Sequence, residues 1–294
     1  MMIERVVQFG SVASLSGVFT EPAPERALAG VPPVVLINSG ILHKVGSCRL
    51  YVKLARALAD AGVSSLRFDL SGLGDSDVRK DALSFEESAV AETQEAMEYL
   101  TRLRGSDVFQ LAGLCSGADV AHMTAVVDPR VVGMASIDAR THLTPGYWWH
   151  NYKPKLFKAK YWVSWVRRRA SGNQAPSWTG GPDDSSLEVP TYVRVIPPRD
   201  ELAAELRTIA SRRVNLLYLF TDGLDFYNHV GQHRRAFSDV PFGDCMTECH
   251  LRGADHILTD AGMQRRAIDM HVQWALATKT RPKPSHVPAL ASAR

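Results

Sequence analysis

The sequence predicts an α/β protein with a mostly parallel central sheet and helices on both of its faces. Apolar runs of strand length alternate with segments of helical period from residue 33 to 138, and again from 199 to 279. One of these runs, 108–112, passes into a helix-forming segment through Gly113 and Gly117, which is typical of a strand that turns sharply into a helix. Both observations favour one large α/β domain over separate helical and sheet domains.

The first half of the chain supplies most of the predicted sheet. Two short alternating segments at 4–10 and 15–20 are expected to be strands, followed by continuous apolar strands at 33–38 and 65–70. Between the latter two, apolar residues at helical spacing predict a helix over 50–61. Ser84 and Glu87 have the spacing of a capping box, which predicts a helix from there to about residue 104. A sixth strand is expected at 131–138.

The alternation stops after the sixth strand and resumes near residue 199. We therefore divide the chain into a first core part at 1–138, a cap insertion at 139–198, a second core part at 199–279 and a flexible tail at 280–294. The second core part is expected to hold helices over 201–212 and 261–278, another helix ending near Phe237, and strands at 214–220 and 246–251. Thr259 is the expected cap of the final helix.

The cap insertion is rich in aromatic and basic residues. Trp148, Trp149 and Tyr152 are expected to combine packing with an apolar, substrate-binding pocket. Its basic residues are equally compatible with a solvated face and with a surface for an acidic partner. The insertion is thus expected to cover a cleft.

Composition limits the classes of function. A net charge of +3 and a pI near 8.7 are too mild to indicate nucleic-acid binding. We see no signal peptide and no apolar stretch long enough for membrane insertion, and four scattered cysteines suggest a reducing, cytoplasmic location. Cys245, Cys249 and His250 lack a second ligand pair at matching spacing, so no metal is expected, and no cofactor.

The turn at Gly113 and Gly117 is centred on Cys115. A nucleophile elbow has glycines two residues on either side of its reactive residue, because a Cβ would clash in so tight a turn. Centring the motif on Ser116 would place Leu114 at one of those positions. The elbow is therefore predicted to present a thiol as its nucleophile.

Two further residues complete a predicted catalytic triad. His256 follows the last strand, in a loop with little packing reason for a histidine. Asp225 follows the next-to-last strand and is the favoured acid, with Asp222 as the alternative and Asp138, at the end of the sixth strand, as a further candidate. Loops at the carboxyl ends of parallel strands meet at one edge of the sheet, so these side chains are expected to converge.

Together, the elbow, the late acid, the terminal histidine and the segment 69–76 resemble the α/β-hydrolase superfamily over residues 1–279. Segments 38–40, 43–46, 49–51 and 67–72 further resemble the hydrolases associated with exosortase systems. Elbows with a cysteine also occur in dienelactone hydrolases and polyhydroxyalkanoate synthases, which this motif resembles locally. The resemblance implies an oxyanion hole formed by the amides of Ser116 and Ile41, the latter following Gly40. Because the loop that holds Gly40 and His43 borders that site, both residues are candidates for substrate contact.

Sulfur chemistry decides which function is expected first. A thiolate forms a thioester acyl-enzyme, which amines and thiols attack readily and water attacks less effectively. The leading hypothesis is an acyltransferase or thioesterase whose acyl thioester or ester substrate is delivered by coenzyme A or an acyl carrier protein. The alternatives are an esterase or lactone hydrolase of small molecules, and a non-catalytic binding protein on a hydrolase scaffold.

Overall fold

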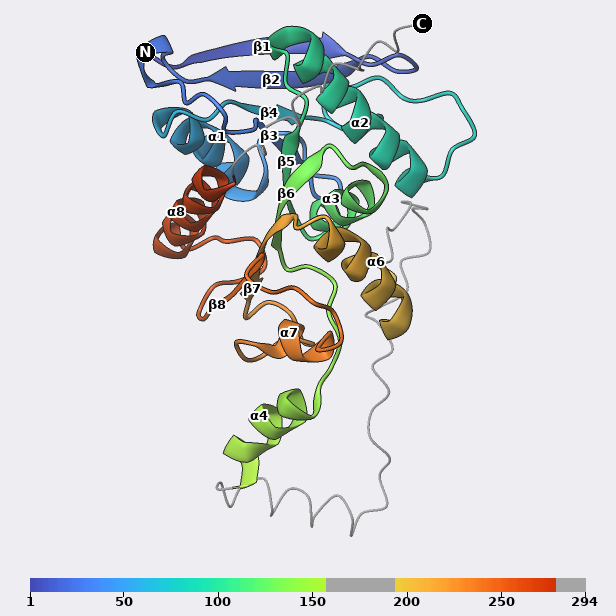
Figure 1. The fold of residues 1–294 in the computed structure, drawn as a ribbon, viewed down its shortest axis with the longest axis vertical. Helices are drawn as coiled ribbons and strands as arrows, with labels where there is room; N and C mark the ends of the chain where they lie inside the picture. The colour runs from blue at the N-terminus through green and yellow to red at the C-terminus, as the bar shows by residue number, and fades with distance from the viewer. Residues whose placement is uncertain (157–193, 279–294) are drawn as a thin grey trace, which may run out of the picture.

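One eight-stranded sheet forms the centre of the protein. The computed structural model describes residues 1–156 and 194–278 (Figure 1). The strands are β1 (Ile3–Phe9), β2 (Leu15–Glu21), β3 (Val34–Ile37), β4 (Ser65–Phe68), β5 (Phe109–Leu114), β6 (Val131–Ile137), β7 (Asn215–Thr221) and β8 (Met246–Leu251). Their order is β1-β2-β4-β3-β5-β6-β7-β8. β1 and β2 pair antiparallel, β2 pairs antiparallel with β4, and all other pairs are parallel.

Helices cover both faces of this sheet. Figure 1 shows α1 (Leu50–Asp60) and α8 (Ala261–Ala277) together on one face, with α2 (Phe85–Arg104), α3 (Ser116–Val127) and α6 (Arg199–Ser211) on the other. Two short 3₁₀ turns, η1 (Pro24–Arg26) and η2 (Ser47–Arg49), and two further helices, α4 (Pro145–Leu156) and α7 (Gln232–Ala236), lie in the connections. The predicted layered α/β fold is confirmed.

Alternation along each inner strand divides the core between the two faces. In β3, Val34 and Leu36 pack with α1 and α8, whereas Val35 and Ile37 pack with α2 and α3. All four side chains are at most 1% exposed. Burying an aliphatic side chain of this size stabilises a fold by about 1.5 to 3 kcal/mol. A strand buried on both faces therefore reads as the continuous apolar run seen in the sequence.

Local signals for helix ends were only partly correct. The Ser84 hydroxyl accepts a hydrogen bond from the Glu87 amide and the Glu87 carboxylate accepts one from the Ser84 amide, so the predicted capping box is confirmed. Thr259 is not the cap of α8; Asp260 is, because its carboxylate accepts from the Met263 amide. The helix expected to end near Phe237 is the five-residue α7.

The region between β6 and α6 contains α4, and 157–193 lie outside the described residues. The boundaries of the cap insertion, and its basic run, therefore stay predictions, as does the tail beyond 278. Across 1–156 and 194–278, every helix is too short or too polar to cross a bilayer.

Candidate active site

Cys115 occupies a sharp turn between β5 and α3. Its backbone has φ 54° and ψ −116°, a conformation that costs a non-glycine residue free energy and is common at functional sites. The flanking glycines allow the close approach of two backbones: a Cβ on Gly113 would lie 2.2 Å from the carbonyl carbon of Gly117, and one on Gly117 would lie 2.5 Å from the Ile37 carbonyl oxygen. The turn leaves the sulfur partly buried at the amino end of α3.

His256 lies against this sulfur. The loop after β8 brings its imidazole close enough to Cys115 to affect the ionisation of the thiol. On its other side, Nδ1 of His256 is 2.7 Å from Oδ2 of Asp138. The structure thus places a thiol, an imidazole and a carboxylate in a row, the arrangement used for nucleophilic catalysis.

The carboxylate in this chain follows β6, whereas the sequence favoured an acid after β7. Asp138 is fully buried, and both of its oxygens are also bound by Thr221, whose amide and hydroxyl donate over 2.7 and 2.8 Å. The two predicted acids do not meet His256. Asp225 is exposed and its backbone carbonyl accepts from the Tyr147 hydroxyl. Asp222 binds the His250 imidazole and the Gly253 amide instead, each over 2.7 Å.

The loop after β7 supports the histidine through backbone packing. A Cβ on Gly223 would lie 2.5 Å from the amide nitrogen of His256, so the two loops touch along their main chains. Asp222 ties the base of the same histidine loop through its bond to Gly253. The loop after β7 therefore contacts the main chain of the histidine loop, while its two acids bind elsewhere.

The surroundings of Cys115 and His256 shift both of their pKa values towards a thiolate that faces an imidazolium. Burial of the sulfur opposes ionisation, but the hydrogen bond from His256 and the charge of Arg194 outweigh it, so the pKa of the Cys115 thiol lies below its ordinary value. The hydrogen bonds to Asp138 and then to Cys115 raise the pKa of His256 to about 10, against the effect of burial. The two shifts agree in direction, as expected for a charged pair.

The two segments that carry the predicted oxyanion donors are joined by a hydrogen bond. The Gly40 amide donates to the Ser116 hydroxyl over 2.6 Å, which ties the loop after β3 to the first residue of α3. Within 1–156 and 194–278, no protein acceptor binds the amide of Ser116 or that of Ile41. The Ile41 side chain is 81% exposed. The Ser116 amide follows the thiol directly in the chain and is a possible donor to a developing oxyanion, and the role of the Ile41 amide stays a prediction.

Tyr51 connects the ends of the two strands that lead to the site. This buried residue of α1 donates its hydroxyl to the Ile37 carbonyl and accepts from the Leu114 amide, over 2.8 and 3.0 Å, and so joins the carboxyl ends of β3 and β5. A Cβ on Gly46 would lie 2.9 Å from the Tyr51 ring, which explains the glycine there.

Lys44 anchors the loop after β3 to the segment after β4 through ion pairs. Its ammonium is 2.5 Å from the buried Asp69 and 2.6 Å from Asp75. The Asp69 carboxylate also accepts from the amides of Lys44 and Asp75. Burial lowers the pKa of Lys44, but the two carboxylates outweigh it and raise the value. The segment that resembled exosortase-associated hydrolases therefore contains a buried ion pair that fixes the loop beside the thiol.

The residues proposed for substrate contact have different surroundings. Gly40 lies beside the thiol through its bond to Ser116, and His43 is exposed further along the same loop. Trp148 and Trp149 are 46% and 57% exposed on α4, which lies beyond α7 in Figure 1. Tyr152 belongs to the same helix. Their contact with a substrate stays a prediction.

Sequence reasoning missed several residues of the site. Thr221 ends a buried strand, and Arg194 and Asp119, which meet beside the elbow, are 75 positions apart. No periodic pattern or short motif marks such contacts. A buried strand that ends directly in an aspartate was the one available signal for Asp138.

Comparison with known proteins shows the fold. No protein-family model and no curated protein sequence matches the chain. Among solved structures, GrgF, an α/β hydrolase from Penicillium sp. sh18, is 14% identical with a TM-score of 0.59, and the match covers 94% of this chain and 99% of that one. A dienelactone hydrolase from Anabaena variabilis is 13% identical, with a TM-score of 0.56 and coverage of 95% and 99%. A cold-adapted esterase from an Arctic intertidal metagenomic library is 13% identical, with a TM-score of 0.54 and coverage of 92% and 94%. The chain therefore has the α/β-hydrolase fold.

Proposed function

We propose that this chain is a hydrolase of ester bonds that works through a covalent intermediate on Cys115, with His256 as acid and base and Asp138 as the carboxylate that orients it. The observation that carries the proposal is the continuous chain from the Cys115 sulfur through His256 to the buried Asp138. An esterase and a dienelactone hydrolase among the proteins of similar fold support the ester class.

In the first half of the reaction, the Cys115 thiolate attacks the carbonyl carbon of the substrate and the carbonyl oxygen becomes an oxyanion. The amides of Ser116 and Ile41 are the donors that would stabilise it, and one such donor typically lowers the barrier by about 3 kcal/mol. As the intermediate collapses, the C–O bond breaks and His256 gives its proton to the leaving alcohol. A thioester acyl-enzyme and a neutral imidazole remain.

In the second half, the neutral His256 takes a proton from water as the water oxygen attacks the thioester. Collapse of this second intermediate releases the carboxylic acid and restores the thiolate beside the imidazolium. The Asp138 carboxylate stabilises the charged imidazole and fixes its ring, so that one nitrogen faces the sulfur throughout.

A second candidate function is acyl transfer or thioester hydrolysis through the same residues. The sulfur nucleophile favours it, because the thioester intermediate is attacked more readily by amines and thiols than by water. Delivery of the acyl group by coenzyme A or an acyl carrier protein belongs to this candidate. Such delivery would depend on charge, so added salt should slow it while leaving a small neutral ester unaffected. The resemblance to exosortase-associated hydrolases fits either reaction.

Intact mass spectrometry tests the proposal. Wild-type protein is incubated with aryl esters, lactones and acyl thioesters, with Cys115→Ala as the control, and products are measured with water, amine and alcohol acceptors. We expect an acyl adduct on the wild type that is missing from the variant, and turnover of esters in water. Turnover only with an amine or alcohol acceptor would favour the transferase. If no substrate forms an adduct and Cys115 also reacts slowly with iodoacetamide at about pH 6, the protein is a non-catalytic binding protein and the proposal is wrong.

A further inference from the structure

We propose that Arg194 is a positioning residue: its guanidinium fixes the backbone of the acid Asp138 and at the same time offsets the negative charge of Asp119 beside the thiol. This inference rests on the catalytic roles proposed above for Cys115, His256 and Asp138. It assigns to the end of the β6–α6 connection a part in catalysis that no motif in the sequence marks.

The guanidinium of Arg194 makes three short contacts with residues of the described ranges 1–156 and 194–278. Its Nε and Nη2 atoms bind the two oxygens of Asp119 over 2.7 and 2.6 Å, and Nη1 donates to the backbone carbonyl of Asp138 over 2.8 Å. The Arg194 side chain is 15% exposed and that of Asp119 only 2%. A bidentate contact of this kind fixes the orientation of the guanidinium as well as its distance from the carboxylate, which a lysine cannot do.

Asp138 has a backbone that needs such support. Its φ of 56° lies in the left-handed region, which a residue other than glycine adopts only at a cost in free energy. The Asp138 amide is held by the Leu219 carbonyl over 2.8 Å, and its carbonyl is held by Arg194. Both ends of the residue are therefore tied, and the carboxylate points at His256 from a fixed backbone.

Asp119 explains why a positive charge is needed at this place. It lies in the first turn of α3, and its amide donates to the Cys115 carbonyl over 3.1 Å. A buried carboxylate so near the elbow opposes a thiolate, and the charge of Asp119 does raise the pKa of Cys115. The charge of Arg194 acts in the other direction. The arginine thus offsets a carboxylate that would otherwise disfavour the reactive form of the sulfur.

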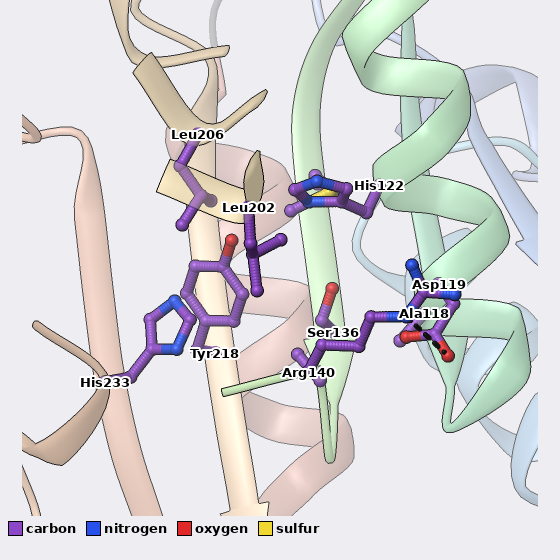
Figure 2. Close-up of a pocket in the computed structure, with 11 residues that line it drawn as sticks. Ala118, Asp119, His122, Ser136, Arg140, Leu202, Leu206, Tyr218 and His233 are labelled. Carbon is purple, nitrogen blue, oxygen red and sulfur yellow. Dashed lines mark ion pairs between the residues drawn. The ribbon is translucent and has the colours of Figure 1, made fainter. Parts of the chain in front are cut away.

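Arg140 provides a matched control. Its Nε lies 3.3 Å from the same carboxylate of Asp119, and the pair forms part of the wall of a small cavity together with Ser136 and Tyr218 (Figure 2). The carbonyl of Asp138, in contrast, accepts from Arg194. Removing Arg140 weakens the charge around Asp119 and leaves the bond to the acid in place.

The test compares Arg194→Met, Arg194→Lys and Arg140→Met with the wild type. Two quantities are measured for each: the pH dependence of alkylation of Cys115 by iodoacetamide, and kcat and KM on an ester that the wild type turns over. For Arg194→Met we expect the alkylation rate at about pH 6 to fall by about tenfold, which corresponds to one unit in the pKa of the thiol, and kcat to fall more than KM rises. Arg194→Lys should recover the alkylation rate and not kcat. The lysine restores the positive charge, but it cannot bind Asp119 in a bidentate way and the Asp138 carbonyl at the same time. Arg140→Met should keep most of kcat.

Wild-type kcat and an unchanged alkylation profile in Arg194→Met, with only a lower melting temperature, would overturn the inference and leave a structural ion pair. If Arg194→Met does not fold, the same two readouts on Arg194→Lys decide: full kcat in that variant contradicts the positioning role. A wild-type Cys115 that alkylates only as an ordinary thiol would instead contradict the proposed function. The two failures are therefore distinguishable.

Discussion

The imidazole of His256 meets the carboxylate of Asp138 across 118 positions of sequence, with 2.7 Å between Nδ1 and Oδ2. The acid comes from the strand next to the one that carries the elbow, because β6 pairs directly with β5. This contact decides which carboxylate in the chain should matter for activity, and it separates Asp138 from two other acids close to the same edge.

Replacing Asp138 by Asn should lower kcat by about a thousandfold or more, because the neutral amide no longer stabilises the imidazolium and can reverse its orientation. Asp225→Asn is the matched control and should retain nearly full activity, since Asp225 is exposed and does not meet His256. Steady-state kinetics on one ester measure both variants. Loss of activity in Asp225→Asn and retention in Asp138→Asn would contradict the structure.

Activity should depend on pH as a plateau between two limbs. It should rise through the lowered pKa of Cys115, where the thiolate forms, and fall near pH 10, where His256 loses its proton and the ion pair disappears. Since the bond to Asp138 is the largest cause of the raised pKa of His256, Asp138→Asn should move the upper limb to lower pH. The rate of Cys115 alkylation against pH measures the lower limb, and kcat/KM on an ester against pH measures both limbs. A single limb at the pKa of a free thiol would contradict the pairing.

The same shift predicts how stability responds to alkali. His256 has a higher pKa folded than unfolded, so its contribution is complete below the unfolded value of about 6.5 and is lost as pH rises through about 10. Wild-type protein should lose more unfolding free energy between about pH 7 and pH 10 than His256→Gln does. Urea unfolding of the two proteins at both pH values gives the comparison, and equal losses would sink this expectation.

Gly117→Ala should destabilise the elbow, because the added methyl would meet the carbonyl oxygens of Ile37 and Asn38 at 2.5 and 2.8 Å. We expect a loss of about 3 kcal/mol, the upper end for overpacking. Gly105→Ala is the control: unlike Gly117, Gly105 has a positive φ, but nothing lies within 4 Å of its Cβ position, so only the backbone cost of about 1 kcal/mol applies. Denaturant unfolding measures both, and equal losses would show that crowding at the turn is relieved.

Lys44→Met should leave the buried carboxylate of Asp69 without its cation and cost about 3 kcal/mol of stability. Because Lys44 lies in the loop that carries the Ile41 amide, kcat should fall as well. Arg213→Met breaks an ion pair with Asp244 that is mostly exposed, and should change little. Thermal unfolding and kinetics on the same samples measure both effects. A Lys44 variant as stable and active as the wild type would show that the loop is held by its backbone alone.

The sequence predicted those features that depend on residues close to one another along the chain. The double-sided burial of β3 and β5 makes each a continuous apolar run, and the close approach of Gly113 and Gly117 requires glycine at both places, so these strands and the elbow were readable. The acid was not readable, because the choice depends on how the β7 loop packs. Gly223 lies on the His256 backbone and Asp222 binds Gly253, which turns that loop into a support for the histidine.

Contacts between distant positions were also beyond the sequence. Nothing near Arg194 indicates that it meets Asp119, and nothing near Thr221 indicates that it binds Asp138. Each of these depends on the parallel order of β5, β6 and β7, which places the strand ends in a row. Only the assembled sheet shows which polar residues share that edge.

The hydrogen bond from Arg194 to the Asp138 carbonyl joins the two ends of the segment that links β6 to α6, which are 56 positions apart. Because these two ends are held together, a segment of another length should replace the residues between them at little entropic cost. Doubling the length of a closed loop adds only about 0.6 kcal/mol. Replacing this segment is thus a route to new substrate preferences that leaves Cys115, His256 and Asp138 in place.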